Sequence, residues 1–326
     1  MAAMHTSAPA FSRPYIRIAV DLDALLTPEG KKGPALPWLA GITRAARQVQ
    51  ANAPGPSPLR ISCISHAGSI ARMQTALQVA QAEGVHIERL HHGQFKVLQA
   101  LPEAPQLYLK LPTLTGQPQR ACHGQVVGEV IGSAIRPFPA DLLAADATDV
   151  CTCLFDFDGV LADDSSERLF QSLGLEAYLK HETERAAEPM PAGPLLGLAL
   201  GLQRLRDDLA VAATSSAAAS GAELGAALGL PTADDRRLTP FRLQLGLLTA
   251  RGAEAIPRVL SSLQAWQFFP CRIDCQAGAQ KAPIVRLLAA DVFFDDGLHN
   301  FQDLPPFTLA VHMPVAAAAA VAADRI

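Results

Sequence analysis

The sequence lacks a run of basic residues and an apolar segment long enough to cross a bilayer. Its formal net charge is −4, whereas a protein that binds polymeric nucleic acid usually carries a clustered basic patch. The apolar residues 195–202 are followed closely by Arg204 and Asp207, and a membrane helix needs about 20 consecutive apolar residues. The first residues also lack the apolar core of a signal peptide. We therefore expect a cytoplasmic protein that binds neither polymeric nucleic acid nor a membrane.

Cysteine is scarce as well. Six cysteines in 326 residues fit a reducing compartment better than the disulfide framework of a small secreted protein. Cys151 and Cys153 point the same way from one expected strand and, with Cys271 and Cys275, allow a zinc site as one interpretation. Packing of small apolar side chains inside a strand is the simpler interpretation of the same pattern.

Two pairs of acidic residues each follow a short apolar run that reads as a buried strand. Asp156 and Asp158 come after the first run, and Asp295 and Asp296 come after the second. Ligands of an open parallel sheet bind at the carboxyl ends of its strands, so we expect the two pairs to meet there. Four carboxylates that meet require a divalent cation, and Mg²⁺ takes oxygen ligands of this kind. Alone, the first pair would fit a solvated turn equally well.

A hydroxyl and an ammonium group lie between the acidic pairs along the chain. Thr249 ends an apolar run, and Lys281 precedes Asp295 by fourteen residues. Both groups suit a phosphoryl group. In isolation, Thr249 would be a strand-end or cap residue, Lys281 a surface lysine and Asp296 the cap of a turn. Their ordered combination instead indicates phosphoryl transfer.

The ordered set Asp-x-Asp, Thr, Lys, Asp-Asp resembles the haloacid dehalogenase superfamily, and longer segments narrow the resemblance. In order, they are FDFDGVLADDSSERLF, GLEAYLKHE, EPMPAGPL, LLTARG, AQKAPI and VFFDDGLH. Together they are similar to the cytosolic type I 5'-nucleotidase family over about residues 151–314. The first motif has the general superfamily form, from which that family often differs slightly. The resemblance implies a Mg²⁺-dependent phosphoric monoester hydrolase that acts on nucleoside 5'-monophosphates.

The resemblance also assigns roles to individual residues. It makes Asp156 the nucleophile that forms an aspartyl-phosphate, and Asp158 the general acid and then the general base, with its backbone carbonyl on the metal. Thr249 would hold a phosphate oxygen, and Lys281 would neutralise charge shared by the phosphate and Asp156. The residues expected around Mg²⁺ are Asp156, Asp158, Asp295 and Asp296.

About residues 163–192 form an insertion relative to the first half of the chain, and we expect this insertion to be a small helical cap. Helical patterns cover 167–173 and 176–185, and prolines follow them. In the resembled family such an insertion closes over the nucleotide and excludes water. The substrate contacts that we consider, besides Thr249 and Lys281, are Phe170, Tyr178 and His181 of the cap and Arg251, which could reach the phosphate. The alternatives are packing of the cap on itself and, for His181, a solvated helix face.

The first half of the chain repeats the order of motifs of the second half. Asp21 and Asp23 match the first acidic pair, residues 33–36 match 193–196, residues 61–65 match the run that ends at Thr249, and Lys96 matches Lys281. This indicates an internal duplication.

The counterpart of Asp295 in the first half is Lys110, and an ammonium at that position would repel Mg²⁺. We therefore expect a degenerate first copy. Asp21 and Asp23 would form salt bridges with Lys96 or Lys110. A phosphate or nucleotide effector held by the two lysines is the alternative.

The predicted fold is α/β with two tandem haloacid dehalogenase-like, Rossmann-like units. A degenerate unit covers 15–125, a connection covers 126–148, and the catalytic unit with its cap covers 149–326. The predicted substrate is a free nucleoside monophosphate. A phosphatase of another small phosphorylated metabolite and a nucleotide-binding regulator without turnover are the alternatives. Base and sugar preference, an allosteric effector and assembly into a homo-oligomer are left open.

Overall fold

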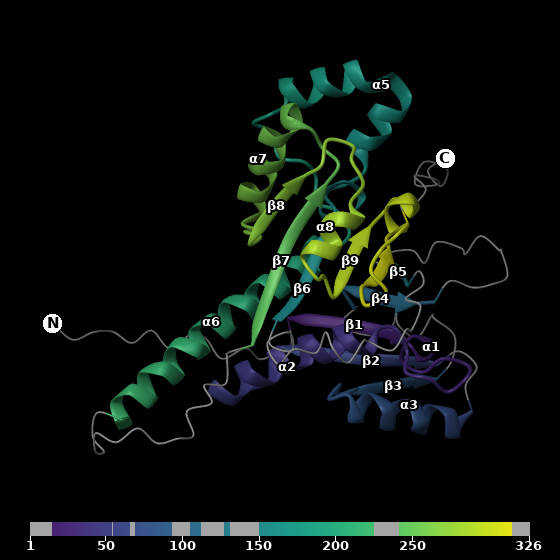
Figure 1. The fold of residues 1–326 in the computed structure, drawn as a ribbon, viewed down its shortest axis with the longest axis vertical. Coiled ribbons are helices and arrows are strands. Elements are labelled where there is room, and N and C mark those ends of the chain that lie inside the picture. The colour runs from purple at the N-terminus through teal and green to yellow at the C-terminus, as the bar shows by residue number, and fades with distance from the viewer. Residues whose placement is uncertain are drawn as a thin grey trace, which may run out of the picture.

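The computed structural model describes residues 15–53, 55–65, 69–92, 105–111, 127–130, 150–224 and 241–314. Within these ranges, ten strands form one sheet, and the second half of the chain lies above the first in Figure 1. The strands are β1 (Ile16–Asp21), β2 (Leu59–Ser65), β3 (Arg89–His92), β4 (Leu107–Lys110), β5 (Val127–Val130), β6 (Val150–Phe155), β7 (Arg242–Thr249), β8 (Arg272–Cys275), β9 (Val292–Asp295) and β10 (Leu309–His312).

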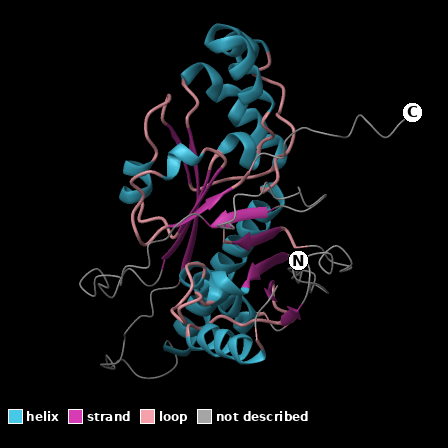
Figure 2. Cartoon of the chain, turned by 90° about the vertical axis from the view of Figure 1, so that its right-hand side faces the viewer, coloured by secondary structure: helices cyan, strands magenta, loops and turns pink. Residues whose placement is uncertain are grey.

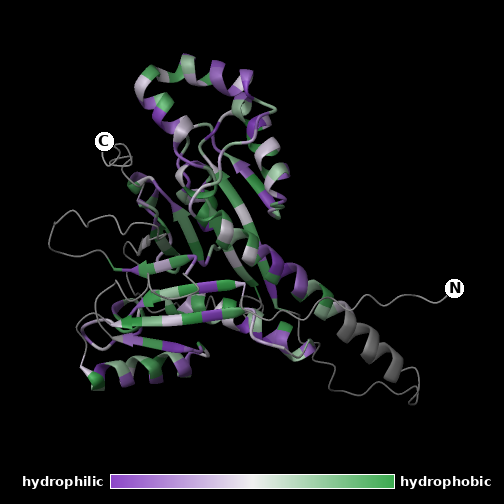
Figure 3. Cartoon of the chain, turned by 180° about the vertical axis from the view of Figure 1, so that it is seen from behind, coloured by the Kyte–Doolittle hydropathy of each residue, from purple (hydrophilic) through white to green (hydrophobic). Residues whose placement is uncertain are grey.

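Helices lie on both faces of this sheet (Figure 2). They are α1 (Leu22–Leu25), α2 (Leu36–Asn52), α3 (Ile70–Ala82), α5 (Ser165–Glu184), α6 (Leu196–Leu224), α7 (Ile256–Trp266) and α8 (Ala282–Leu287), with shorter turns η3 (Phe157–Leu161), η4 (Ala253–Ala255) and η5 (Leu298–Phe301). Hydrophobic residues are concentrated on the strands that these helices cover (Figure 3). Among the described residues, none of the helices has both the length and the apolar character that a bilayer crossing requires.

The sheet consists of two parallel halves with the same strand order. The full order is β3-β2-β1-β4-β5-β10-β9-β6-β7-β8, so each half reads 3-2-1-4-5 when it is numbered from its own first strand. Among the described strands, antiparallel pairing occurs at β5 and β10, where the halves meet. The predicted α/β, Rossmann-like class is confirmed. Because the halves join antiparallel, their carboxyl-terminal strand ends face opposite edges of the sheet.

Strand pairing shows which residues of the two halves are equivalent. The last paired residues of β1 and β4 are followed by Asp21 and Lys110, and those of β6 and β9 by Asp156 and Asp295. The register therefore makes Lys110 the counterpart of Asp295, as the duplication predicts. The second strands of the halves, β2 and β7, end on Ser65 and Thr249.

A glycine loop that follows the first strand is also repeated. Gly33 N donates to Leu25 O at 2.8 Å, and Gly193 N donates to Leu161 O at 2.7 Å. A Cβ atom at either glycine would lie 2.2 Å from a backbone oxygen. Both loops therefore require glycine for the same steric reason.

Helices α2 and α6 each pack on the other half as well as on each other. A Cβ atom at Gly41 of α2 would lie 3.0 Å from Cys151 Sγ at the start of β6. A Cβ atom at Gly201 of α6 would lie 3.1 Å from Ile16 Cγ1 at the start of β1. Equivalent helices thus make equivalent contacts with the central strand of the opposite half.

The two halves share one hydrophobic core. Trp38 of α2 packs edge-on against Phe294 of β9, with ring centroids 5.7 Å apart. Strand β5 lies within residues 126–148, which the sequence analysis assigned to a connection, and it pairs with β4 and β10. Residues Val127–Val130 of this segment are therefore part of the sheet, and the sequence analysis missed this strand.

Helix α5 lies in the expected insertion of about residues 163–192, here called the cap, and it packs on α7, η3 and η4. Non-helical backbone at Gly174, with φ of 81°, divides α5 into two segments. This confirms the two predicted helical stretches. Helix α6 continues through the alanine-rich residues that follow Asp208 as far as Leu224.

Candidate active site and metal centre

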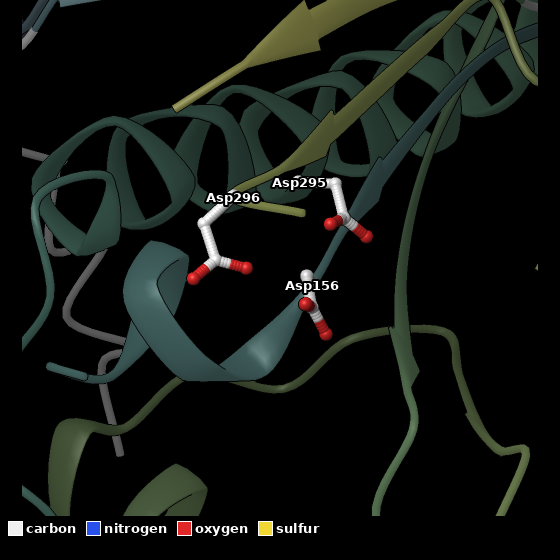
Figure 4. A group of neighbouring side chains, drawn as sticks. All are labelled: Asp156, Asp295 and Asp296. Carbon is white, nitrogen blue, oxygen red and sulfur yellow. The ribbon is translucent and has the colours of Figure 1, made fainter. Parts of the chain in front are cut away.

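Three carboxylates gather where β6 and β9 end (Figure 4). Asp156 follows β6, Asp295 ends β9, and Asp296 comes next. Each offers one oxygen, and the three oxygens lie within 4.8 Å of one another. Asp156 N also donates to Phe294 O at 2.8 Å, which fixes the two strand ends together. An all-oxygen, anionic donor set in a buried place fits a hard divalent cation such as Mg²⁺.

Lys281 bridges two of these carboxylates. Its Nζ lies 2.8 Å from Asp156 Oδ2 and 2.7 Å from Asp295 Oδ2, and its side chain is 1% exposed. Burial raises the pKa of Asp156 well above its ordinary value, and the ammonium opposes this in part. Burial disfavours the ammonium as well, but the two carboxylates outweigh it and raise the pKa of Lys281. The lysine therefore stays charged.

Asp295 is held on its other side by two further donors. Gly297 N donates to Asp295 Oδ1 at 2.7 Å, and Asn300 Nδ2 donates to the same oxygen at 2.9 Å. The opposite oxygen of Asp156, Oδ1, accepts from Phe157 N at 2.7 Å. The sequence analysis missed Asn300, because an isolated asparagine in a loop carries no distinguishing pattern.

Asp296 packs against the glycine of the first motif. Burial, and then the neighbouring charge of Asp295, raise the pKa of Asp296 to about 7. A Cβ atom at Gly159 would lie 2.4 Å from Asp296 Oδ2, and Gly159 has a φ of 69°. Only glycine fits there without displacing a carboxylate of the group.

The carboxylate of Asp158 lies outside the group of three. Arg251 Nε donates to Asp158 Oδ2 at 2.8 Å, and Arg251 Nη2 donates to Oδ1 at 2.7 Å. The metal contact predicted for Asp158 and the phosphate contact predicted for Arg251 stay predictions. Here each carboxylate oxygen of Asp158 is bound to one planar guanidinium.

Thr249 lies at the same sheet edge, because β7 pairs with β6 in parallel. Its side chain is buried, and its hydroxyl oxygen accepts from Arg251 N at 3.2 Å. The hydroxyl proton remains available to a phosphate oxygen.

The cap contributes a charged residue that the sequence analysis missed. Glu182 is fully buried and is paired with Arg251 and with Arg258 of α7. His181, a predicted substrate contact, has a side chain that is 25% exposed, and its Nδ1 lies 3.2 Å from Glu182 Oε1. The sequence did not indicate that Glu182 and Arg258 are buried, because charged residues in helices usually face solvent.

Two aromatic residues of the cap approach this ion-paired group. Phe170 and Tyr178 form an edge-to-face pair with ring centroids 5.9 Å apart. The guanidinium carbon of Arg251 lies 5.9 Å from the Tyr178 ring and 4.9 Å from the Phe157 ring. Phe170 remains 41% exposed. The pair thus packs on itself and still offers an aromatic surface near Asp158.

Zinc binding by cysteine is contradicted within the described residues. The group with metal-binding geometry in that part of the chain contains the three carboxylates and no cysteine. Cys151 and Cys153 are buried, and Trp38 Nε1 donates to Cys153 Sγ at 3.3 Å. A hydrogen bond to Cys153 and burial raise the pKa of the Cys151 thiol. Cys271 is exposed.

The equivalent place in the first half has a different ion pair. Asp23 Oδ1 lies 2.5 Å from Nη2 of Arg72 on α3, and Arg72 also donates to Leu26 O at 2.9 Å. Lys110 is buried. Lys96 lies outside the described residues, so its predicted salt bridge stays a prediction. The sequence analysis did not anticipate Arg72 as the partner of Asp23.

Comparison with known proteins agrees with these motifs. A family model described as 5'-nucleotidase matches residues 133–320. The human protein "Cytosolic 5'-nucleotidase 1B" is 29% identical over 149 residues, which cover 45% of this chain and 21% of that protein. This chain therefore matches only about one fifth of that relative's length. No solved structure matches. Since the family model covers more than half of the chain, the protein belongs to the 5'-nucleotidase family.

Proposed function

We propose that the protein is a Mg²⁺-dependent 5'-nucleotidase that hydrolyses nucleoside 5'-monophosphates to nucleoside and phosphate. The observation that carries the proposal is the buried pair Asp156 and Asp295, bridged by Lys281 at 2.8 and 2.7 Å. Membership of the 5'-nucleotidase family supplies the substrate class. A carboxylate beside an ammonium at a sheet edge suits attack on a dianionic phosphate.

In the proposed first step, an oxygen of Asp156 attacks phosphorus and the bond from phosphorus to O5′ breaks. Asp158 gives its proton to the departing O5′, and the phosphoryl group remains on Asp156. In the second step, water attacks phosphorus, the bond to Asp156 breaks, and Asp158 takes the proton of the water. Thr249 donates to a phosphate oxygen, and Lys281 neutralises charge on the phosphate and on Asp156. When bound by Asp156, Asp295 and Asp296, Mg²⁺ supplies further charge neutralisation.

The cap supports a nucleoside as the leaving group. Tyr178 lies beside the Arg251 guanidinium that holds Asp158, and Phe170 contacts Tyr178. A nucleobase can stack on an aromatic surface of this kind. We propose that these two residues contact the base, while His181 acts within the cap through its contact with Glu182.

We further propose that the first half is a degenerate unit without catalytic function. Lys110 stands where the second half has Asp295, and Asp23 is paired with Arg72. A binding role for this half and a cytoplasmic location stay predictions of the sequence.

The test is phosphate release from a panel of nucleoside monophosphates and sugar phosphates, measured with Mg²⁺ and with excess chelator. Release from nucleotides that stops on chelation supports the proposal and identifies the preferred base. Selective release from sugar phosphates would support the proposed reaction but contradict a nucleotide as its substrate. Binding of nucleotides without any release would favour a regulator and overturn the enzymatic proposal.

A further inference from the structure

A buried group of charged side chains joins the cap to the core. Glu182, near the end of α5, is fully buried, and Arg251 Nη1 donates to one of its oxygens while Arg258 Nη1 donates to the other. The hydroxyl of Ser166, at the start of α5, also donates to Glu182, at 2.8 Å. Burial opposes ionisation, but the two guanidinium groups and Ser166 hold the pKa of Glu182 below its usual range. The glutamate is therefore a fixed charge inside the protein.

One guanidinium is shared between this fixed charge and Asp158. Arg251 uses Nε and Nη2 for the two oxygens of Asp158, at 2.8 and 2.7 Å, and it uses Nη1 for Glu182. Its side chain is 2% exposed. A planar guanidinium with three bonds in fixed directions has essentially one orientation. Glu182 therefore determines where the Asp158 carboxylate lies, although the two acids do not touch.

Contacts with α7 fix the cap side of this network. Arg258 Nε donates to Glu188 O at 3.2 Å, and Met190 N donates to Ser262 Oγ at 2.9 Å. The segment that follows α5 is thus hydrogen-bonded to α7 at the residues on both sides of Pro189. Glu182 is held in the core by Arg258 independently of Arg251.

We propose that Glu182 is a positioning residue for phosphoryl transfer: through Arg251, it holds the Asp158 carboxylate beside the leaving oxygen of the nucleotide. This inference rests on the proposed function, in which Asp158 donates a proton to O5′. Carboxylate oxygens have more than one lone pair each, so Asp158 bound to Arg251 still has a place for that proton. Without the charge on Glu182, Arg251 loses its second anchor and Asp158 loses its fixed direction. Loss of Glu182 should therefore slow proton transfer to O5′ and leave the rate of attack on phosphorus unchanged.

Two leaving groups separate these steps. The nucleoside of AMP leaves with a proton, whereas the p-nitrophenolate of p-nitrophenyl phosphate leaves without one. With Mg²⁺ present, Glu182→Gln should slow first-turnover release of adenosine about 10- to 100-fold, since a general acid contributes about 10²- to 10⁴-fold. The first-turnover burst of p-nitrophenolate should stay within about twofold of wild type. Glu184→Gln is the control, because that residue lies on the same helix with an exposed side chain, 3.9 Å from Lys180.

Arg251→Lys provides a second variant that keeps the charge and removes the two-pronged bond to Asp158. It should give the same selective loss, and it carries the test if Glu182→Gln fails to fold. Adding Glu182→Gln to Asp158→Asn should slow adenosine release no further. Equal slowing with both substrates, or normal release from AMP in both variants, would overturn the positioning role. A wild-type protein that releases no nucleoside from any nucleoside monophosphate would instead overturn the proposed function, so the two failures are distinguishable.

Discussion

The two halves of the sheet have one topology and different chemistry. Each half reads 3-2-1-4-5 in strand order, and each has an aspartate at the end of its first strand: Asp21 ends β1 and Asp156 follows β6. The second half then adds Gly159, a cap and Asp295, whereas the first half has Lys110 at the position of Asp295. A few substitutions at strand ends thus separate a group of carboxylates that could hold a metal ion from an ion-paired group. The strand order is insensitive to these changes because packing inside the sheet sets it.

Packing also explains why the first half is retained. Trp38 reaches Phe294, and Gly41 and Gly201 let α2 and α6 approach the opposite central strands. The hydrophobic core is continuous across the junction. The first half therefore supports the second half structurally, whatever else it does.

The sharpest test of the comparison changes the equivalent aspartates. Asp156→Asn removes the proposed nucleophile, so phosphate release from a nucleoside monophosphate should fall at least about 10³-fold. Asp21→Asn should leave release within about twofold, because the first half has Lys110 where the second half has Asp295. Steady-state phosphate assays and thermal unfolding of both variants measure activity and folding. A large loss of rate in well-folded Asp21→Asn would give the first half a catalytic role.

Much of this arrangement can be predicted from the sequence, because it depends on apolar runs and on the residues directly after them. Strand β6 begins and ends where the apolar run 150–155 does, and the carboxylates of Asp156, Asp295 and Asp296 meet as expected. Equal spacing in the two halves also predicts the counterpart of each motif. Parallel strands bring their carboxyl ends to one edge, so linear order is enough to assemble the group.

The other features of the fold and of the site depend on strand pairing and ion pairs between distant residues, which the sequence does not reveal. Strand β5 has the sequence Val-Gly-Glu-Val, which is short and half polar, and it is a strand because β4 and β10 flank it. Glu182 and Arg258 look like solvated helix residues until their partners are known. The direction of the Asp158 carboxylate depends on Arg251, whose guanidinium comes from a different strand end. Long-range ion pairs of this kind leave no local pattern.

A second test concerns the glycine that the first half lacks. Gly159→Ala would place a Cβ atom 2.4 Å from Asp296 Oδ2, in a backbone with φ of 69°. We expect the Mg²⁺ concentration for half-maximal activity to rise at least about tenfold, since metal ligands tolerate little displacement. Gly30→Ala is the matched control, because its φ is 78° and nothing lies within 4 Å of the added atom. It should lose about 1 kcal/mol of stability and keep its Mg²⁺ dependence. Unchanged Mg²⁺ dependence in Gly159→Ala would remove Asp296 from the metal centre.

A third test concerns the junction between the halves. Gly201→Leu overfills the contact between α6 and Ile16, so the free energy of unfolding should fall by about 2 kcal/mol or more. Gly197→Leu, one turn earlier on the same helix, is the control, because that residue is exposed and its nearest neighbour would be 3.8 Å away. Urea denaturation followed by the signals of both halves should give one transition. Two separate transitions would show that the halves unfold independently, in conflict with a shared core.

The smallest expected effect concerns an acid in the second half and the amide at the equivalent position of the first half. Asp291 Oδ2 accepts from Thr152 N at 2.7 Å, and in the first half Gln106 Oε1 accepts from Arg17 N at 2.9 Å. Burial raises the pKa of Asp291 to about 6, above its value in the unfolded chain. The folded state therefore binds the extra proton, and this group reduces stability progressively as the pH rises from about 4 to 6. Asp291→Asn should match wild type below pH 4 and be more stable by about 2 kcal/mol at pH 7.

Urea denaturation at several pH values measures this difference, and Gln106→Glu is the converse experiment. That variant introduces a carboxylate at the equivalent place in the first half, so its stability relative to wild type should decline over the same pH range. The expected decline in stability has one cause at both positions, because each side chain accepts from one backbone N–H and a carboxylate there gains a charge as the pH rises. Gln106→Glu also loses the bond from Gln106 Nε2 to Gly197 O, at 3.0 Å, and this loss lowers stability at every pH. If Asp291→Asn is less stable than wild type at pH 7, the charged hydrogen bond to Thr152 N outweighs the desolvation of Asp291. The two halves would then differ at this position because the second half gains stability from its acid.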